Sequence, residues 1–392
     1  MMNLKHLFKL MWNRRKMNLL MIIEIFISFI IIFVLAQSLV KFAVYYSEPL
    51  GFEYKNIWNL EVNSNNMENT EARKEIELIK QEIKSYAEVI EISEAYAIPY
   101  TSVDMRTTVE LDDKEILTNM MLGDDNYAEV LGIELVAGRW FDEQDNASNY
   151  KPIVINRKLK EYFFGDEEAV GKFLGQRDDQ RLIIGVVDQI KKRGELNDFG
   201  KLLFKRINPE NPDSWIGESI LIKMKPGTNM DFEEKLMRRL SIISNNFTLE
   251  MRSLEAMRER SFDKYSSIVY IFAFISLFLV INVSLGLFGV LWYNINYRKS
   301  EIGIRRSFGS TARNIYSQIV GETMVISTFS LILGSFIVFQ LYVFLRNWLR
   351  PDIFYASYII SVIVIYLITA ICAFYPSKLA ADIEPAEALH DE

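Results

Sequence analysis

The sequence predicts a membrane protein with four transmembrane α-helices and a large α+β extracytoplasmic domain between the first and second helices. Four apolar runs are long enough to span a bilayer, and residues 45–265 contain no such run. The 392 residues are 50% hydrophobic with a mean hydropathy of +0.08, which suits membrane segments combined with a soluble domain. A short basic stretch between the second and third runs sets the orientation.

The charge distribution separates the soluble part from the membrane part. Residues 45–265 contain 30 Lys+Arg and 42 Asp+Glu, a balance of −12, whereas the rest contains 14 and 9, a balance of +5. An acidic soluble domain argues against a nucleic-acid partner. Cys372 is the single cysteine, so no intramolecular disulfide is expected. With only His6 and His390, far apart in sequence, we expect no metal site, cofactor site or catalytic residue.

Residues 1–18 predict a cytoplasmic amphipathic elbow helix. Its apolar residues recur at the spacing of one helix face, namely Leu4, Leu7, Phe8 and Met11. Such a helix lies in the membrane interface, in contact with lipid, with Trp12 at headgroup depth. The basic residues Arg14, Arg15 and Lys16 hold this end inside.

Residues 19–40 predict the first transmembrane helix. At 1.5 Å per residue they span ~33 Å, enough for the hydrocarbon core. A cleaved signal peptide is the rival interpretation, but the run is too long and no small-x-small cleavage site follows. Glu24 is the one ionisable residue in the run. It is either a functional residue or a side chain that snorkels or bonds a neighbouring helix.

Residues 41–265 form the predicted extracytoplasmic domain, and its two ends show the same strand-helix-strand pattern. Strand patterns at 56–63 and 87–97 flank a helical stripe at 70–86. Strand patterns at 219–225 and 247–252 flank a second helix, which Asp231 opens with Glu234 in a capping-box spacing. Two β-α-β units separated by an insertion predict a split α+β layer.

The inserted subdomain shows a turn at 138–146, a strand and short helix within 151–174, and a strand at 181–191. Residues 191–218 read as a loop that could contact a partner. The acids of the turns could suggest calcium, but their spacing is not that of an EF-hand, which favours solvated turns. These acids are Asp142, Glu143, Asp145, Asp166, Glu167 and Glu168.

Three further spans are predicted, at 268–292, 318–345 and 354–375. A charged helical segment, 253–267, leads directly into the first of them and would couple it rigidly to the soluble domain. Gly286 and Gly289 permit close helix contact. Glu322 lies near the inner end of the third span. Pro351 suits the start of the fourth helix and Pro376 its end, before a cytoplasmic tail at 376–392.

Residues 297–317 predict a cytoplasmic loop that determines the topology. Its basic residues, set against the single acid Glu301, are Arg298, Lys299, Arg305, Arg306 and Arg313. Both termini are then cytoplasmic, although Arg346 and Arg350 on the outer turn are a mild conflict. An apolar side of the loop could contact a protein, through Ile302, Ile304, Phe308 and Ile315. The alternative is a basic loop held to anionic lipid. Gly309 can end one helix and Ser310 can cap the next.

The run EIGIRRSFGSTARNI, beginning at Glu301 and followed by Glu322 and Gly334, resembles the signature of FtsX/MacB-type ABC transporter permeases. The order of short motifs between Gly138 and Val187 also matches. The tail matches at Pro385, Glu387, Ala388 and Leu389, with His390 where the family usually has Arg. The resemblance implies a porter-like outer subdomain and a bacterial inner-membrane location. It also implies an ATPase-coupling role for Glu301, Ile302, Ile304, Arg305, Arg306 and Phe308.

The same resemblance implies a permease that forms a homo- or heterodimer and works by mechanotransmission with two ATPases. No Walker A motif occurs, so the ATPase is expected on a separate polypeptide. Three functions stay open: transport or efflux of a peptide, lipoprotein or hydrophobic compound, FtsX-like regulation of an envelope enzyme, and membrane-anchored binding without an ATPase. The large outer domain favours transport, with a possible periplasmic adaptor, and the basic loop disfavours simple anchoring.

Overall fold

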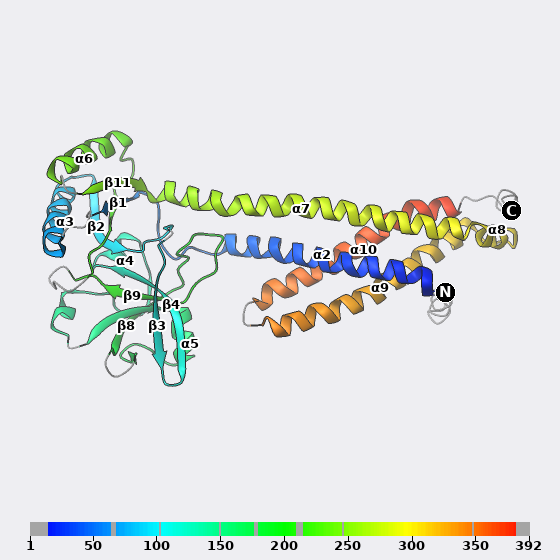
Figure 1. The fold of residues 1–392 in the computed structure, drawn as a ribbon, viewed down its shortest axis with the longest axis horizontal. Coiled ribbons are helices and arrows are strands. Elements are labelled where there is room, and N and C mark those ends of the chain that lie inside the picture. Colours follow the sequence, from blue (N-terminus) through cyan, green and yellow to red (C-terminus); the bar gives the residue numbers. More distant parts are fainter. Residues whose placement is uncertain are drawn as a thin grey trace. The chain divides into compact units, whose positions relative to one another are not determined.

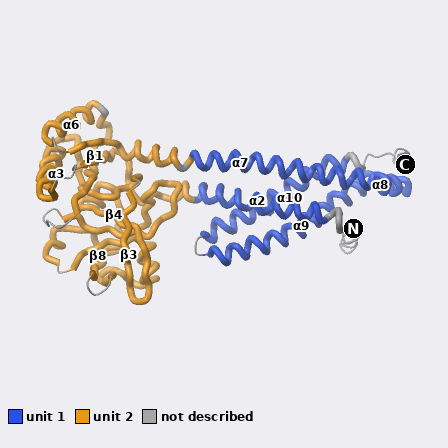
Figure 2. Tube along the Cα trace, viewed as in Figure 1, with its two compact units in different colours: residues 1–44, 267–392 blue, residues 45–266 orange. Residues whose placement is uncertain are grey.

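The computed structural model describes residues 15–63, 68–101, 103–148, 150–175, 179–208, 215–244, 247–346 and 349–381. The chain divides into two compact units, one made of residues 1–44 and 267–392 and the other of residues 45–266 (Figure 2). Most of the expected elbow helix, residues 1–14, and the tail from residue 382 lie outside the described residues.

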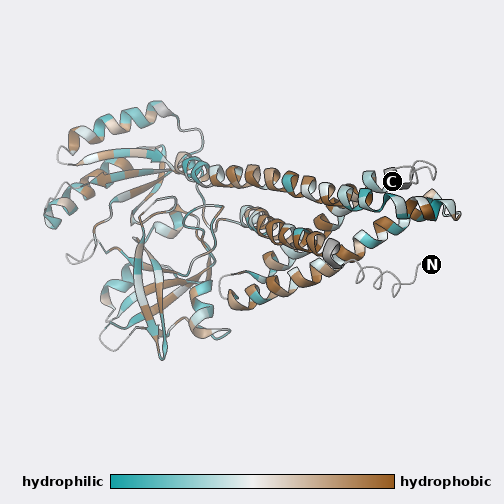
Figure 3. Ribbon diagram, turned by 45° about the vertical axis from the view of Figure 1, so that its right-hand side comes forward, coloured by the Kyte–Doolittle hydropathy of each residue, from teal (hydrophilic) through white to brown (hydrophobic). Residues whose placement is uncertain are grey.

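The first unit is helical. Its helices are α2 (Arg15–Ser47), α7 (Leu254–Tyr297), α8 (Lys299–Ser307), α9 (Ala312–Phe344) and α10 (Pro351–Ala381), of which α2 and α7 also contribute residues to the other unit (Figure 1). Among the described residues, α2, α7, α9 and α10 are long and apolar enough to cross a membrane (Figure 3). Each overlaps one predicted span.

Small residues let these helices approach closely. A Cβ atom added at Gly334 of α9 would lie 2.4 Å from the Phe29 ring of α2, and one at Gly286 of α7 would lie 2.1 Å from the Glu24 carboxylate. The prediction of close contact is therefore confirmed at Gly286. At Gly289 no described atom outside the residue's own stretch of helix lies within 4 Å of an added Cβ, so close contact at that position stays a prediction.

Proline begins α10 but does not end it. Pro351 is the first residue of the helix, as predicted, because its missing N–H costs nothing there. The expectation that Pro376 stops the helix is wrong, since α10 continues to Ala381. Proline has no N–H to donate, so the Cys372 carbonyl lacks its usual helical partner at this point.

The second unit is built on one mixed sheet. Among the described residues it has 11 strands in the order β11-β1-β10-β2-β4-β9-β6-β8-β5, with β3 paired to β4 and β7 to β8. Their bounds are β1 (Ile57–Asn63), β2 (Val89–Tyr96), β3 (Met105–Leu111), β4 (Lys114–Gly123), β5 (Leu135–Gly138), β6 (Lys151–Asn156), β7 (Phe173–Leu174), β8 (Arg181–Val187), β9 (Leu202–Arg206), β10 (Ser219–Met224) and β11 (Thr248–Ser253).

The predicted split β-α-β layer is confirmed. β10 pairs antiparallel with both β1 and β2, so the two β-α-β units interleave. Helices α3 (Asn69–Lys84) and α6 (Met230–Ile243) cover one face of these strands (Figure 1). Their stripes are buried against the sheet, with Ile76 and Ile79 from α3 and Leu236 and Leu240 from α6. Asn229 rather than Asp231 caps α6, because its side chain accepts the Phe232 N–H.

The insertion extends the same sheet. The expected strand, short helix and strand are β6, α5 (Arg157–Phe164) and β8. The interpretation of 191–218 as loop is wrong for residues 202–206. They form β9, which pairs parallel with β4 and antiparallel with β6 and thereby joins the two halves of the sheet. The β3–β4 hairpin was also missed, and α4 (Tyr127–Val130) packs beside β2.

The acidic turn at residues 142–147 closes on itself. Asp142 and Asp145 form a capping box for the short 3-10 helix η1 (Glu143–Ala147). The Asp145 carboxylate also accepts two hydrogen bonds from the Arg139 guanidinium, at 2.6 and 2.9 Å. Burial alone would raise the pKa of Asp145, but these bonds outweigh it and hold the pKa below its usual value.

Candidate functional site

Helix α8 forms a tight elbow between α7 and α9. It ends in a Schellman motif at Gly309, whose φ is 91°. The Gly309 N–H donates to the Arg306 carbonyl at 3.0 Å and the Ser310 N–H to the Arg305 carbonyl at 3.1 Å. The predicted helix end is thus confirmed. Thr311, not Ser310, caps α9, because its hydroxyl accepts the Asn314 N–H at 3.3 Å.

An apolar cluster fills the inside of the elbow. It consists of Ile295, Ile302, Ile315 and Ile319, all of them buried. Burial of such aliphatic side chains favours the bent arrangement of the three helices by roughly 1.5–3 kcal/mol each. The expectation that Ile302 and Ile315 share an exposed apolar side with Ile304 is corrected, because both face this cluster.

The outer face of α8 carries two exposed apolar side chains. Ile304 is 45% exposed and Phe308 is 88% exposed. They are four residues apart, so they lie on the same side of the helix. Arg306, also on α8, makes no ion pair with any described residue. Ile304 and Phe308 therefore present an exposed apolar surface, whereas Arg306, two positions from each of them, is only partly exposed and lies on another side of the helix.

A polar network braces the elbow from within. The Arg298 guanidinium lies 2.6 Å from the Glu322 carboxylate of α9 and 3.5 Å from that of Glu301. Arg305 donates to Glu301 at 2.6 Å and to Gln318 at 2.8 Å, and Gln318 donates to Glu322 at 2.8 Å. Glu301, Arg305 and Glu322 therefore hold α8 to α9.

The Glu24 carboxylate of α2 faces α7. Its Oε1 lies where a side chain at position 286 would begin, and its Oε2 is buried without a hydrogen-bond partner among the described residues. The nearby hydroxyl of Ser28 bonds the Glu24 backbone carbonyl, at 2.6 Å, and not its carboxylate. Glycine at 286 is what makes room for this polar group between the two helices.

A second cluster, the 191–195 loop, lies in the other unit and was missed in the sequence. Lys191 is fully buried, and its ammonium donates to the carbonyls of Tyr45 and Glu195 and lies 3.0 Å from the Glu48 carboxylate. A buried charge is tolerated only when it is paired and hydrogen-bonded in this way. Tyr45 belongs to the last turn of α2, so Lys191 fastens the end of that helix.

The rest of the 191–195 loop contacts two other segments. Lys192 donates to the Val103 carbonyl at 2.7 Å, and Arg193 pairs with Asp104. Glu195 pairs with Arg258 in the second turn of α7, and Ser261 donates to the Arg193 carbonyl at 3.2 Å. The sequence feature that could have indicated this cluster is the run of three basic residues, 191–193, within an acidic domain.

Comparison with known proteins agrees with this architecture. The model of the MacB-like periplasmic core domain matches residues 17–239, more than half of the chain, and that of the FtsX-like permease C-terminal region matches residues 271–385. The chain belongs to the MacB/FtsX permease family. It is a multi-pass membrane permease with an extracytoplasmic domain between its first and second apolar helices.

Among the relatives are the macrolide export ATP-binding/permease proteins MacB of Pasteurella multocida and Neisseria gonorrhoeae, both 25% identical over 306 residues. The match covers 76% and 75% of this permease and 46% of each relative, so the permease spans about half their length.

Two solved structures are similar to part of this chain. The periplasmic region of MacB from Actinobacillus actinomycetemcomitans is 18% identical, has a TM-score of 0.39, and covers 55% of this chain and 96% of its own. The extracellular domain of YknZ, a noncanonic ABC-type transporter from Gram-positive bacteria, is 14% identical, has a TM-score of 0.36, and covers 50% and 100%.

Proposed function

We propose that this permease couples ATP hydrolysis by a separate ABC ATPase to extracytoplasmic movement or efflux of a substrate, by mechanotransmission. The observation that carries the proposal is the exposed Ile304–Phe308 surface on an elbow that is itself rigidly braced. The substrate is a peptide, lipoprotein or hydrophobic compound. Family membership and the MacB relatives support this assignment.

The proposed topology follows from the positions of the basic residues. Residues 297–317 and both termini are cytoplasmic, and residues 41–265 lie outside the bacterial inner membrane. The Ile304–Phe308 surface of α8 then faces the compartment that contains ATP.

The elbow has the properties of a docking segment that transmits force. Ile304 and Phe308 are the anchors that a partner would bury, and binding energy usually concentrates in a few such residues. Arg306, on another side of α8, supplies positive charge that steers the approach of the partner. The Arg298–Glu322 pair and the inner isoleucines ensure that a push on α8 moves α9 with it. A lipid-bound loop would need the positive charge but not the exposed apolar pair.

The 191–195 loop fits the outer end of the same mechanism. Lys191 fastens the last turn of α2, and Glu195 and Arg193 fasten the second turn of α7, to one loop of the soluble unit. Movement of either helix would therefore reach the sheet through short, charged contacts rather than through a flexible linker.

We further propose that the permease works as a homo- or heterodimer and that a periplasmic adaptor is a possible partner. An FtsX-like role, in which the outer domain regulates an envelope enzyme, is the alternative. The large outer domain, with its split β-α-β layout, favours MacB-like transport over FtsX-like regulation.

Co-purification from the native host tests the docking surface. The tagged permease is expressed as wild type, as Ile304→Asp with Phe308→Asp, and as Arg305→Glu with Arg306→Glu. A matched control changes two exposed aliphatic residues of the soluble unit, Leu78→Asp with Ile242→Asp. We expect the first pair to lose ATP hydrolysis from the eluate while the control retains it. Wild-type recovery for the first pair, with loss for the arginine pair, would favour the lipid-bound loop instead.

A further inference from the structure

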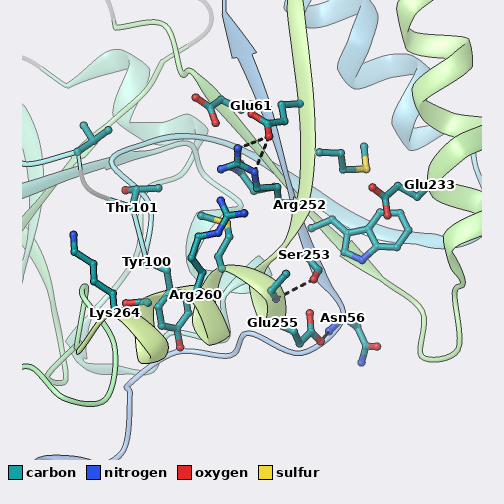
Figure 4. Close-up of a pocket in the computed structure, with 18 of the residues that line it drawn as sticks. Asn56, Glu61, Tyr100, Thr101, Glu233, Arg252, Ser253, Glu255, Arg260 and Lys264 are labelled. Carbon is teal, nitrogen blue, oxygen red and sulfur yellow. Dashed lines mark hydrogen bonds and ion pairs between the residues drawn. The ribbon is translucent and has the colours of Figure 1, made fainter. Parts of the chain in front are cut away.

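We propose that a pocket at the start of α7 binds the phosphate-bearing headgroup of an anionic amphiphile. The pocket has a volume of about 1320 Å³ and lies within the soluble unit (Figure 4). Its walls are β1, the edge strand β11, the first turns of α6 and α7, and the segments around Tyr100 and Arg193. This inference concerns the soluble unit alone and does not depend on the ATPase.

One face of α7 supplies the basic wall of the pocket. The lining residues Met257, Arg260, Ser261 and Lys264 follow the i, i+3, i+4, i+7 spacing of a single helix face. Figure 4 shows the Arg260 and Lys264 side chains projecting from the same side of α7. Two cations one helical turn apart therefore project from one face of α7 into the pocket.

These two cations are not neutralised by the protein. Arg260 and Lys264 are exposed and make no ion pair with any described residue. The other two basic residues of the pocket are already engaged, since Arg193 pairs with Asp104 and Arg252 bonds Glu250 at 2.8 Å. The structure thus contains a pair of positive charges that no acidic side chain satisfies.

A guanidinium and an ammonium group on one helix face are suited to phosphate. Arginine offers a planar fork of donors and lysine a compact charge, and both bind phosphate oxygens with strong, charge-assisted bonds. The acids of the pocket, Glu61, Glu233, Glu250 and Glu255, would repel an anion. They restrict the anion to the part of the pocket lined by Arg260 and Lys264. No acidic residue of α7 after Glu255 lines the pocket.

The position of the cations along α7 indicates an amphiphile. Lys264 is four residues before Ile268, where the apolar run begins, which is about 6 Å along a helix. The headgroup layer of a bilayer extends over a comparable depth beyond the hydrocarbon core. Val103 and Met257 supply apolar lining beside the cations for the part of the molecule next to its headgroup.

Native mass spectrometry of the full chain in neutral detergent tests the proposal. The permease is titrated with phosphatidylglycerol or with phosphatidylcholine of the same acyl chains, and we expect tighter binding of phosphatidylglycerol. Arg260→Gln with Lys264→Gln should weaken phosphatidylglycerol binding about tenfold or more, because two charge-assisted contacts are lost. The matched control, Lys225→Gln with Arg238→Gln, removes two exposed cations outside the pocket and should bind as wild type.

Two further measurements localise the ligand. Photo-crosslinking with a headgroup-reactive phosphatidylglycerol should label peptides from 97–104 and 254–264, and unchanged melting temperatures show that both variants are folded. Equal weakening in the pocket variant and the control, or no preference for phosphatidylglycerol, would overturn the proposal. Competition by glycerol 3-phosphate shows which kind of molecule supplies the phosphate group. If glycerol 3-phosphate displaces phosphatidylglycerol, a soluble phosphate ester suffices. If phosphatidylglycerol stays bound, a membrane amphiphile is the ligand.

Discussion

The Arg298 guanidinium lies 2.6 Å from the Glu322 carboxylate, and both side chains are 12% exposed. This pair links the junction of α7 and α8 to the side of α9, three turns from the start of that helix. Glu322 thereby has a physical role that its place near the end of an apolar run did not reveal. It neutralises an arginine and fixes the elbow that carries Ile304 and Phe308.

Replacement of Glu322 by Gln should loosen the elbow. The change keeps the side-chain shape but removes the charge that pairs with the largely buried Arg298, so we expect a loss of about 1–3 kcal/mol in the free energy of unfolding. Denaturation of the detergent-solubilised permease measures it. The exposed Arg238–Glu234 pair is the control, and Glu234→Gln should cost no more than about 0.5 kcal/mol. Equal effects of the two changes would remove the structural role assigned to Glu322.

Lys191→Met should release the end of α2 from the soluble unit. The variant leaves the Tyr45 and Glu195 carbonyls and the Glu48 carboxylate without their buried cation, at a cost of about 3–5 kcal/mol. Hydrogen exchange should then speed up at residues 45–51 and 191–195 and stay unchanged in α3. Lys74→Met, on the exposed face of α3, is the control. Uniform acceleration across the soluble unit would instead mean general unfolding.

Asp124 should make stability depend on pH. Burial raises the pKa of this carboxyl from 3.8 to about 6, although the Ser93 hydroxyl, the Glu94 N–H and the nearby Lys80 oppose the shift. A raised pKa means that the folded state binds the proton more tightly than the unfolded state. The contribution of Asp124 to stability is therefore greatest below pH 3.8 and is lost as the pH rises through about 6.

The free energies of unfolding of the wild type and Asp124→Asn are compared by denaturation between pH 5 and 7.5. The contributions of the other titrating groups cancel in the difference. The wild type should gain stability relative to the variant as the pH falls. A difference that is constant with pH, or one that grows as the pH rises, would show that the carboxyl is not protonated in the folded protein.

Cysteine labelling checks the proposed topology. In a Cys372→Ser background, a membrane-impermeant thiol reagent added to intact cells should label Asp113→Cys in the exposed β3–β4 turn. It should miss Ser310→Cys until the membrane is opened. Labelling at position 310 in intact cells would place α8 outside and end its proposed link with an ATPase.

Some of the fold follows from local pattern, and some does not. The apolar runs and the stripes of α3 and α6 were predictable because each is a periodic signal within one element. β9 was not, because its five residues, Leu202–Arg206, end in two basic side chains and its partners β4 and β6 are far away in sequence. Its strand character comes from burial between those partners, which only the assembled sheet supplies.

The sequence predicted where the candidate site lies but not which way its side chains face. Composition locates the basic loop. The expectation that Ile302 and Ile304 share one face is wrong, because side chains two positions apart on a helix point in directions about 200° apart. The step of about 100° per residue predicts that Ile302 faces the inside of the elbow when Ile304 and Phe308 share the exposed face. The partners of Lys191 could not be counted in this way, because Tyr45 is 146 residues away from it.

Site-specific photo-crosslinking at Phe308 tests the central claim most directly. A photoreactive phenylalanine analogue replaces Phe308, which is 88% exposed on α8, and in a matched variant Phe336, which is 68% exposed on α9. After irradiation of intact cells, we predict that position 308 is joined to an ATP-binding polypeptide and that position 336 is not. Adducts of position 308 with lipid alone, or the same protein adducts at both positions, would contradict the account.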